Sequence, residues 1–392
     1  MFYYLSQLPE WLMANGHAQW GDWLSPLRVF QYITFRGAGA AVTALMLCWL
    51  LGPMVIRWLK RIGVRQEYQD RARKDGKMTD GVSKRGVPTM GGLLIVGVID
   101  LSALLWAQWN PLVTLTLLSM LVLCLLGFYD DYSKITRQNS DGLTEKVKLV
   151  VQFVLSATIA VYLWRLEETR QLITDVMVPF IKDPILSGPS ATMVISWAAV
   201  MGVVITVCAI MGSSNAVNFT DGLDGLAVGS VLIVSMVFYV FTYIAGNAEL
   251  ARELYVPAVS GAGELSVVCA AMMGACLGFL WFNCFPARVF MGDTGSLALG
   301  GSLGIVAVLV HQPWVLVIAG GIFVLEAASV ILQRSWFKWT RIRTGEGRRI
   351  FLMAPLHHHF EKKGWHENQV VVRFYIIGIL FAVLALATLK LR

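Results

Sequence analysis

Asp130 and Asp131 are two adjacent carboxylates that end the uncharged run Pro111–Tyr129. As a helix this run would rise about 28 Å, close to the hydrocarbon thickness of a bilayer. Two like charges beside a low-dielectric slab are costly unless a cation, a proton or a metal shares their site. Lys134 would share a helix face with Asp130. The group therefore predicts a metal or phosphate site, the simpler alternative being a surface ion pair at a helix end.

A second polar group follows another apolar run, in the stretch Asn218–Leu226. Asn218, Asp221 and Asp224 stand there with two glycines in a connection too short to leave a membrane surface. Their donors and acceptors suit a ribose, a base or a hydrated Mg²⁺. A helix N-cap would need only one of these residues. The stretch is interpreted as part of a binding pocket.

Asp293 lies between Gly292 and Gly295 at the start of the apolar run Ser296–Val310. One aspartate could serve as a helix cap, but the two glycines also predict a close approach of another backbone or a ligand. The chain places Asn283 and Phe290 just before it. This connection is the third candidate for the site.

Three consecutive histidines, His357, His358 and His359, occur late in the chain. Consecutive residues do not share a helix face, so all three are poorly placed to bind one metal ion. Phosphate hydrogen bonding or orientation is the preferred interpretation, with metal binding and acid–base chemistry as alternatives.

Basic residues accompany these groups. Lys84 and Thr89 belong to a Gly- and Pro-containing stretch that opens an apolar run, and Lys146 and Lys148 open a later one. A helix N-terminus beside Lys and Arg is a ready anion site, and an ordinary helix start is an equal alternative for Lys84 and Thr89.

Composition says which elements must position these residues. The 392 residues are 56% hydrophobic and 15% charged, with a mean hydropathy of +0.63. These values predict an all-α, polytopic integral membrane protein with about ten transmembrane helices. The expected spans are Gly37–Ile56, Met90–Ala107, Pro111–Tyr129, Val147–Trp164, Ala191–Gly212, Leu223–Ala245, Leu265–Phe282, Ser296–Val310, Trp314–Leu332 and Val370–Leu389.

Most of the 32 Lys and Arg fall in alternate connections, which the positive-inside rule places in the cytoplasm, with both termini in the periplasm. The chain is expected to form one domain, 1–392, whose cytoplasmic loops 57–89, 130–146, 213–222, 283–295 and 333–369 form the site. Residues 1–36, rich in Trp, are expected to form a periplasmic interfacial segment. The six cysteines are interpreted as apolar core residues.

All four polar groups thus emerge on the cytoplasmic side. At this point the sequence resembles the polyprenyl-phosphate N-acetylhexosamine-1-phosphate transferases over nearly its whole length. The stretches that carry the resemblance are Pro88–Gly92, Asn218–Leu226, Met291–Ser296 and Pro355–Phe360.

The resemblance implies an enzyme of the bacterial inner membrane that acts in peptidoglycan synthesis. It would transfer phospho-MurNAc-pentapeptide from UDP-MurNAc-pentapeptide to undecaprenyl phosphate, giving lipid I and UMP, and it would require Mg²⁺. The partners implied are these two substrates, the lipid bilayer and a second copy in a homodimer. No nucleic acid is expected.

The resemblance also implies roles for single residues. Asp293 would bind Mg²⁺, Asp130 would deprotonate the lipid phosphate and Asp131 would support the metal region. The uridine pocket would be lined by Lys84, Asp224, Asn283 and Phe290, with Asn218 and Asp221 shaping the same cleft. Lys134 and Lys146 would contact phosphates. The sugar-phosphate or pyrophosphate side would be contacted by His357, His358 and His359.

Three alternatives stay open. A related transferase would use UDP-GlcNAc. A covalent two-step route would make a carboxylate the nucleophile in place of direct attack by the lipid phosphate. A proton-coupled transporter would instead depend on the acids inside apolar runs, Asp100 and Glu326.

Overall fold

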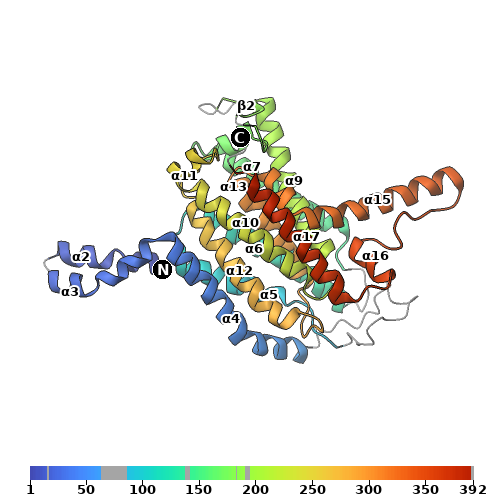
Figure 1. Ribbon diagram of the computed structural model, residues 1–392, viewed down its shortest axis with the longest axis horizontal. Coiled ribbons are helices and arrows are strands. Elements are labelled where there is room, and N and C mark those ends of the chain that lie inside the picture. The colour runs from blue at the N-terminus through green and yellow to red at the C-terminus, as the bar shows by residue number, and fades with distance from the viewer. Residues whose placement is uncertain (16, 63–85, 137–141, 182, 190–194, 390–392) are drawn as a thin grey trace.

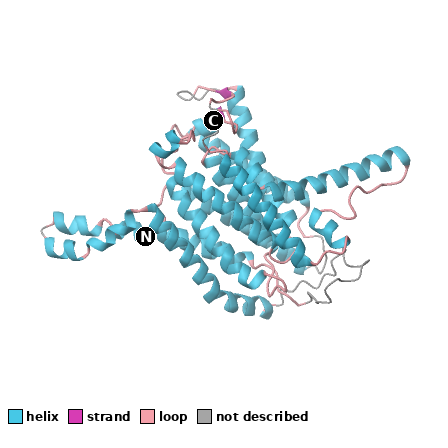
Figure 2. Ribbon diagram, viewed as in Figure 1, coloured by secondary structure: helices cyan, strands magenta, loops and turns pink. Residues whose placement is uncertain are grey.

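The computed structural model describes all residues except 16, 63–85, 137–141, 182, 190–194 and 390–392. The described chain is a bundle of long helices with two projecting arms (Figure 1) and almost no strand (Figure 2). This confirms the predicted all-α, multi-pass membrane fold. The long elements are α4 (Ile33–Arg61), α5 (Gly92–Trp106), α6 (Pro111–Thr136), α7 (Glu145–Arg165), α9 (Trp197–Thr220), α10 (Leu226–Ala245), α12 (Gly263–Asn283), α13 (Gly292–Leu309), α15 (Gly321–Thr344) and α17 (Glu367–Ala387).

Of the short elements, α2 and α3 lie in the arm at the left of Figure 1, and β2 and α11 lie at the upper end of the bundle. A two-stranded antiparallel sheet pairs Asp175 with Ser187 in the connection between α7 and α9. These elements are α1 (Phe2–Leu5), α2 (Leu8–Ala14), α3 (Ala18–Trp23), η1 (Ser25–Gln31), α8 (Gln171–Thr174), β1 (Asp175–Val176), β2 (Leu186–Ser187), α11 (Ala248–Glu253), α14 (Pro313–Ala319) and α16 (Leu356–Lys362).

Helix α13 is the centre of the bundle. In its most apolar stretch 89% of residues are buried, against 28% in the corresponding stretches of α4, α7 and α17. Those three helices therefore leave most of their apolar surface on the outside of the bundle. Small residues allow its neighbours to approach closely, as is usual for membrane helices. A Cβ on Gly300 would lie 2.5 Å from the carbonyl oxygen of Ser213 on α9, and one on Gly127 of α6 would lie 2.1 Å from the carbonyl oxygen of Asp293. The contacts bring the site-bearing ends of α6 and α9 against the first turn of α13.

Among the described residues, eight helices are long and apolar enough to span a membrane, and the bent pair α14 and α15 passes the same test when its two helices are taken together. Apolar α5 is shorter. The expected ninth span, Trp314–Leu332, is not one straight helix, because α14 and α15 meet at 83° across Gly320. A Cβ on Gly321 would lie 2.6 Å from the ring of Phe381, so the break fits tightly against α17.

The helices also extend further into the expected cytoplasmic loops than the sequence suggested. Helix α6 continues to Thr136, α9 to Thr220 and α15 to Thr344. The site residues in these stretches are therefore presented from helix ends, whose backbones are rigid.

The end of the bundle opposite Asp293 contains a buried ion pair between α4 and α12. Arg36 donates from Nη1 to Oε2 of Glu264 at 2.5 Å and from Nη2 to Oε1 at 2.6 Å. The same carboxylate accepts from the backbone N–H of Gln108 at 2.7 Å. This pair joins the first span, α12 and the connection that follows α5.

Candidate active site

Asp130, Asp131 and Asp293 come together at one end of the bundle, each with a carboxylate oxygen within 4.8 Å of the others. The first two lie in the last turns of α6 and the third in the first turn of α13. Among the described residues, these three form the group of acidic, His or Cys side chains whose spacing suits a metal ion. Carboxylate oxygens are the ligands that Mg²⁺ prefers, so the donor set fits the predicted cofactor.

Two lysines lie among the three carboxylates. Lys148, in the first turn of α7, donates to Oδ2 of Asp130 at 2.7 Å and to Oδ2 of Asp293 at 2.8 Å. Lys134 is 2.6 Å from Oδ2 of Asp130 and 3.0 Å from Oδ2 of Asp293. Three acids facing two ammonium groups leave one negative charge in excess when all are ionised. The cluster is thus suited to take up a further cation, or to release its lysines to phosphate oxygens.

Asp131 is oriented by the first turn of α13. Its Oδ2 accepts from the backbone N–H of Thr294 at 3.0 Å and from the Thr294 hydroxyl at 2.7 Å. Gly292 has φ +72°, and a Cβ there would lie 2.5 Å from Oδ2 of Asp131 and 2.7 Å from Oγ1 of Thr89. The sequence signal of paired glycines around Asp293 therefore has its explanation in a close approach of three segments.

Asn218 joins α9 to the cluster. Its side-chain amide donates to Oδ1 of Asp293 at 2.8 Å and to the Ser296 hydroxyl at 2.9 Å. Each oxygen of Asp293 thereby has a protein donor, which orients the carboxylate from both sides. Asn218, which was expected to shape the uridine cleft, is thus in direct contact with the proposed metal ligand Asp293.

The residues Asp221–Gly225 connect α9 to α10 and are called the 221–225 turn below. Burial, followed by the charges of Asp293, Asp131 and Asp224, raises the pKa of Asp221 to about 8. Its carboxyl group therefore carries a proton over much of the neutral range in the absence of a cation. Asp224 is buried and accepts from the backbone N–H of Ala287 at 2.9 Å, which joins the turn to the segment before α13.

Asn283 and Phe290 border that turn. Asn283 accepts from the N–H of Gly225 at 3.1 Å and donates to the carbonyl oxygen of Val289 at 2.9 Å. The backbone of Phe290 pairs with the Pro88–Gly92 stretch, since its N–H donates to the Pro88 carbonyl at 2.8 Å and its carbonyl accepts from Gly91 at 2.9 Å. The N–H of Gly92 also donates to the carbonyl oxygen of Met291 at 3.0 Å. With the contact between Asn218 and Asp293, this links the stretches Pro88–Gly92 and Asn218–Leu226 to Met291–Ser296.

The three histidines of α16 have different partners, although the ring centroids of His357 and His358 lie 4.1 Å apart. His357 is fully buried, with its Nδ1 3.3 Å from Oε2 of Glu326 but without hydrogen-bond alignment, and burial lowers its pKa. His358 Nδ1 lies 2.7 Å from Glu361, and His359 Nδ1 accepts from the N–H of Leu352. They share no contact that would place them on one metal ion.

His357 also touches the 221–225 turn. A Cβ on Gly222 would lie 2.2 Å from its Nε2, so the ring packs directly on the Gly222 backbone. Oε1 of Glu326 accepts the backbone N–H of His357 at 3.2 Å. Glu326, an acid inside an apolar run, is therefore part of the support of α16.

Most predicted site residues that the structure describes lie in or beside this cluster. Lys84 falls outside the described residues. Lys146 is exposed on α7, and the lysine of α7 that contacts the aspartates is Lys148. Residues two apart point to different faces of a helix, but only the packing of α7 shows which face is turned to the cluster. From the sequence, Lys146 and not Lys148 was predicted as a phosphate-binding residue, whereas the structure brings Lys148 to the aspartates.

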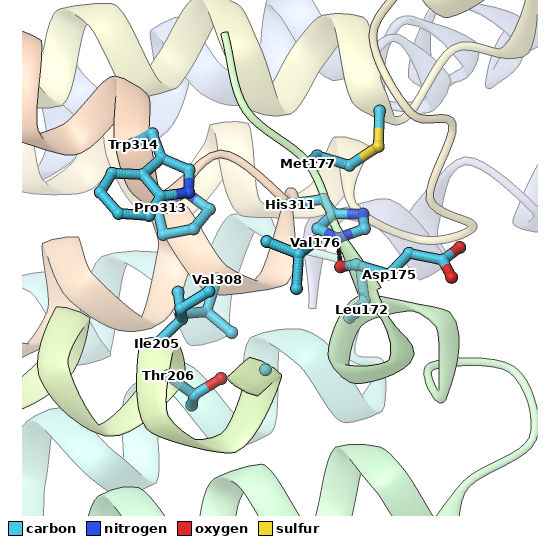
Figure 3. Close-up of a pocket in the computed structure, with 11 residues that line it drawn as sticks. Leu172, Asp175, Val176, Met177, Ile205, Thr206, Val308, His311, Pro313 and Trp314 are labelled. Atoms are coloured by element: carbon cyan, nitrogen blue, oxygen red, sulfur yellow. Dashed lines mark hydrogen bonds between the residues drawn. The ribbon is translucent and has the colours of Figure 1, made fainter. Parts of the chain in front are cut away.

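A hollow lies far from the cluster, between β1, α8, α9 and the α13–α14 connection (Figure 3). Thr206 in its lining precedes Asn218 on α9 by about 18 Å of helix. The ring of His311 is 2.7 Å from the carbonyl oxygen of Asp175, which ties β1 to the end of α13 (Figure 3). This hollow contains none of the aspartates or lysines of the cluster.

Fold and cluster together define a polytopic helical membrane protein whose site is suited to phosphate and divalent-cation chemistry. The family model for glycosyl transferase family 4 matches residues 113–311. A phospho-N-acetylmuramoyl-pentapeptide-transferase of Methylacidiphilum infernorum (isolate V4) is 48% identical over 375 residues, covering 95% of this chain and 98% of the relative. A protein of the same name from Neisseria meningitidis is 45% identical and covers 96% of this chain and 99% of the relative. Another from Chlorobaculum parvum is 44% identical and covers 100% of both chains. The chain belongs to glycosyl transferase family 4 and, within it, to the phospho-N-acetylmuramoyl-pentapeptide-transferases.

Proposed function

We propose that the protein transfers phospho-MurNAc-pentapeptide from UDP-MurNAc-pentapeptide to undecaprenyl phosphate, giving lipid I and UMP. The observation that carries the proposal is the convergence of Asp130, Asp131 and Asp293 with Lys134 and Lys148, in a chain of this family. The reaction would take place at the cytoplasmic face of a bacterial inner membrane, with the lipid acceptor arriving from the bilayer.

In the proposed reaction an oxygen of the lipid phosphate attacks the β-phosphorus of the donor. A new P–O bond forms, and the bond from that phosphorus to the bridging oxygen breaks, so that UMP leaves with the electron pair. The charges of three phosphates gather at one place. Lys134 and Lys148, at 2.6–3.0 Å from the carboxylates, are positioned to turn toward these phosphate oxygens.

Asp293 and Asp131 would hold Mg²⁺, which when bound would neutralise phosphate charge. Asp130 would orient the acceptor and take its remaining proton. A phosphate monoester has a second pKa near 6, so most of the acceptor is already ionised at neutral pH. The contribution of Asp130 as a base is therefore expected to be modest. Its main role would be to position Lys134 and Lys148.

The uridine end of the donor would occupy the region of the 221–225 turn, with Asn283 and Phe290 beside it. The sugar-phosphate would face α16. His358 and His359 are partly exposed and could reach a ligand, whereas His357 is buried and would act through its packing on Gly222.

The test is a transfer assay with purified full-length protein, radiolabelled UDP-MurNAc-pentapeptide and undecaprenyl phosphate. Mg²⁺-dependent release of UMP with a labelled lipid product is expected, and EDTA should stop it. UDP-GlcNAc in place of the donor should give little product. Equal or better use of UDP-GlcNAc would move the protein to the related branch of the family.

The direct route and the covalent route give different single-turnover results. With donor and Mg²⁺ but no lipid acceptor, direct attack predicts neither UMP release nor labelled protein. Stoichiometric UMP release with acid-stable label on the protein would instead establish a carboxylate nucleophile. An Asp130→Asn variant in the same assay would show whether Asp130 is that nucleophile.

A further inference from the structure

The backbone of the 221–225 turn is held by the last helix of the chain. The N–H of Asp224 donates to Oε1 of Glu367 at 2.8 Å, and the hydroxyl of Tyr375 donates to the carbonyl oxygen of Gly225 at 2.7 Å. Glu367 begins α17, and Tyr375 lies about two helical turns further along it. Two points of contact on one rigid helix therefore hold two adjacent residues of the turn.

Both residues are closely packed where they contact the turn. Glu367 is 3% exposed, so its hydrogen bond to the turn is shielded from water. The ring of Tyr375 packs on Gly229 of α10, where a Cβ would lie 2.2 Å from the tyrosine oxygen. Gly225 has φ +82°, a conformation that favours glycine and depends on its neighbours to hold it.

The shape of this turn decides where the nucleotide-pocket residues lie. Gly225 donates to Asn283, and the Asp224 carboxylate accepts from Ala287, so a shift of the turn would move both sides of the proposed uridine pocket. The hydrogen bonds from Glu367 and Tyr375 described above reach the turn at Asp224 and Gly225. Their influence on the reaction would thus pass through the nucleotide and not through the reacting phosphates.

We propose that Glu367 and Tyr375 are positioning residues for the nucleotide end of the donor. The inference rests on the proposed function, because that function places uridine at the 221–225 turn. An interaction that serves substrate and transition state equally changes KM and leaves kcat nearly unchanged. Loss of either contact is therefore expected to raise the KM for the nucleotide donor without slowing the chemical step.

Conservative variants separate this role from general packing. Tyr375→Phe removes one hydroxyl and keeps the ring on Gly229. Glu367→Met removes the acceptor at similar size, while Glu367→Gln keeps an oxygen that can accept from Asp224. Tyr162→Phe, on an exposed part of α7, is the matched control.

Two measurements on the purified full-length variants test the proposal: steady-state UMP release at varied donor concentration, and equilibrium binding of radiolabelled UMP without lipid. For Tyr375→Phe and Glu367→Met we expect the KM and the Kd for UMP to rise about three- to tenfold, with kcat within about twofold of wild type. Glu367→Gln should recover most of the affinity, and Tyr162→Phe should match wild type.

The outcomes also separate the inference from the proposed function. Unchanged KM and UMP affinity in both variants, or a fall in kcat alone, would overturn the inference while transfer by the wild type stands. Weakened UMP binding in the variants together with no transfer by the wild type would support the inference and refute the proposed reaction. No UMP binding by the wild type would overturn the inference.

Discussion

Two buried clusters of charge lie at opposite ends of the bundle, and they differ in balance and access. Arg36 and Glu264 pair one cation with one anion through two hydrogen bonds, and their side chains are 1% and 7% exposed. The aspartate cluster sets three carboxylates against two lysines, with the side chain of Lys134 29% exposed and that of Asp293 16% exposed. The first cluster is balanced in charge and closed to solvent. The second is unbalanced and open, as expected of a site that receives charged ligands.

The largest expected effect is on Asp293. Asp293→Asn keeps the size of the side chain but removes the charge on which Lys134, Lys148 and the proposed Mg²⁺ depend. We expect transfer activity to fall at least about 10³-fold, since metal-based charge stabilisation is worth several kcal/mol. UMP release from correctly folded variant measures it. Activity within tenfold of wild type would mean that the two clusters do not differ in function.

At the opposite end of the bundle, a substitution in the Arg36–Glu264 pair is expected to lower folding stability and not activity. Arg36→Met leaves Glu264 buried without its partner, which costs about 3–5 kcal/mol. Thermal unfolding in detergent should show a clearly lowered Tm, while kcat at a temperature where the variant is folded stays near wild type. Adding Glu264→Gln should restore part of the Tm. A loss of kcat in folded protein would show that this pair also serves the reaction.

Lys148 and Lys146 sharpen the comparison within the site. Lys148→Met removes a cation that contacts two aspartates, and we expect about a 30-fold loss of kcat/KM, in line with the loss of a charge-assisted hydrogen bond. Lys146→Met, from the exposed face of α7, should lose less. Equal losses would indicate that bound substrate recruits both lysines.

These lysines show how far the sequence alone could lead. Asp130, Asp131, Asn218 and Asp293 could be grouped, because apolar runs placed all of them at the same membrane face. The choice of lysine needed the rotation of α7 about its axis, which depends on neighbours distant in sequence.

The helix break at Gly320 likewise could not be predicted from the sequence, because the apolar run continues on both sides of it. The bend depends on packing against α17. The supports from Glu367 and Tyr375 are single residues in an ordinary helical pattern. Nothing in that pattern distinguishes them from solvent-facing or core residues.

Gly222→Ala should have a smaller effect than loss of Lys148. The new methyl group would meet Nε2 of His357 at 2.2 Å, so the turn or the buried ring must shift. We expect about a tenfold fall in kcat/KM. Gly212→Ala, where an added Cβ meets no atom within 4 Å, is the control. If both variants behave alike, the packing of His357 on the turn has no bearing on activity.

The smallest effect concerns pH. Because burial holds the pKa of His357 below its unfolded value of about 6.5, folding favours the neutral ring. The contribution of the neutral His357 ring to folding stability is fully present above about pH 6.5 and is lost as the pH falls below that value. The Tm of wild type should therefore fall more steeply between pH 7 and pH 5 than that of His357→Gln. Parallel curves would show that His357 is not held neutral.

The 83° bend between α14 and α15 makes α15 a lever with its pivot at Gly320. The helix extends roughly 36 Å from Gly321 to Thr344, whereas Glu326 is only about 8 Å from the pivot. A tilt of about 5° would move the far tip by about 3 Å but Glu326 by less than about 1 Å. Because Glu326 lies so near the break, its hydrogen bond to the backbone of α16 is insensitive to the direction of the projecting end of α15.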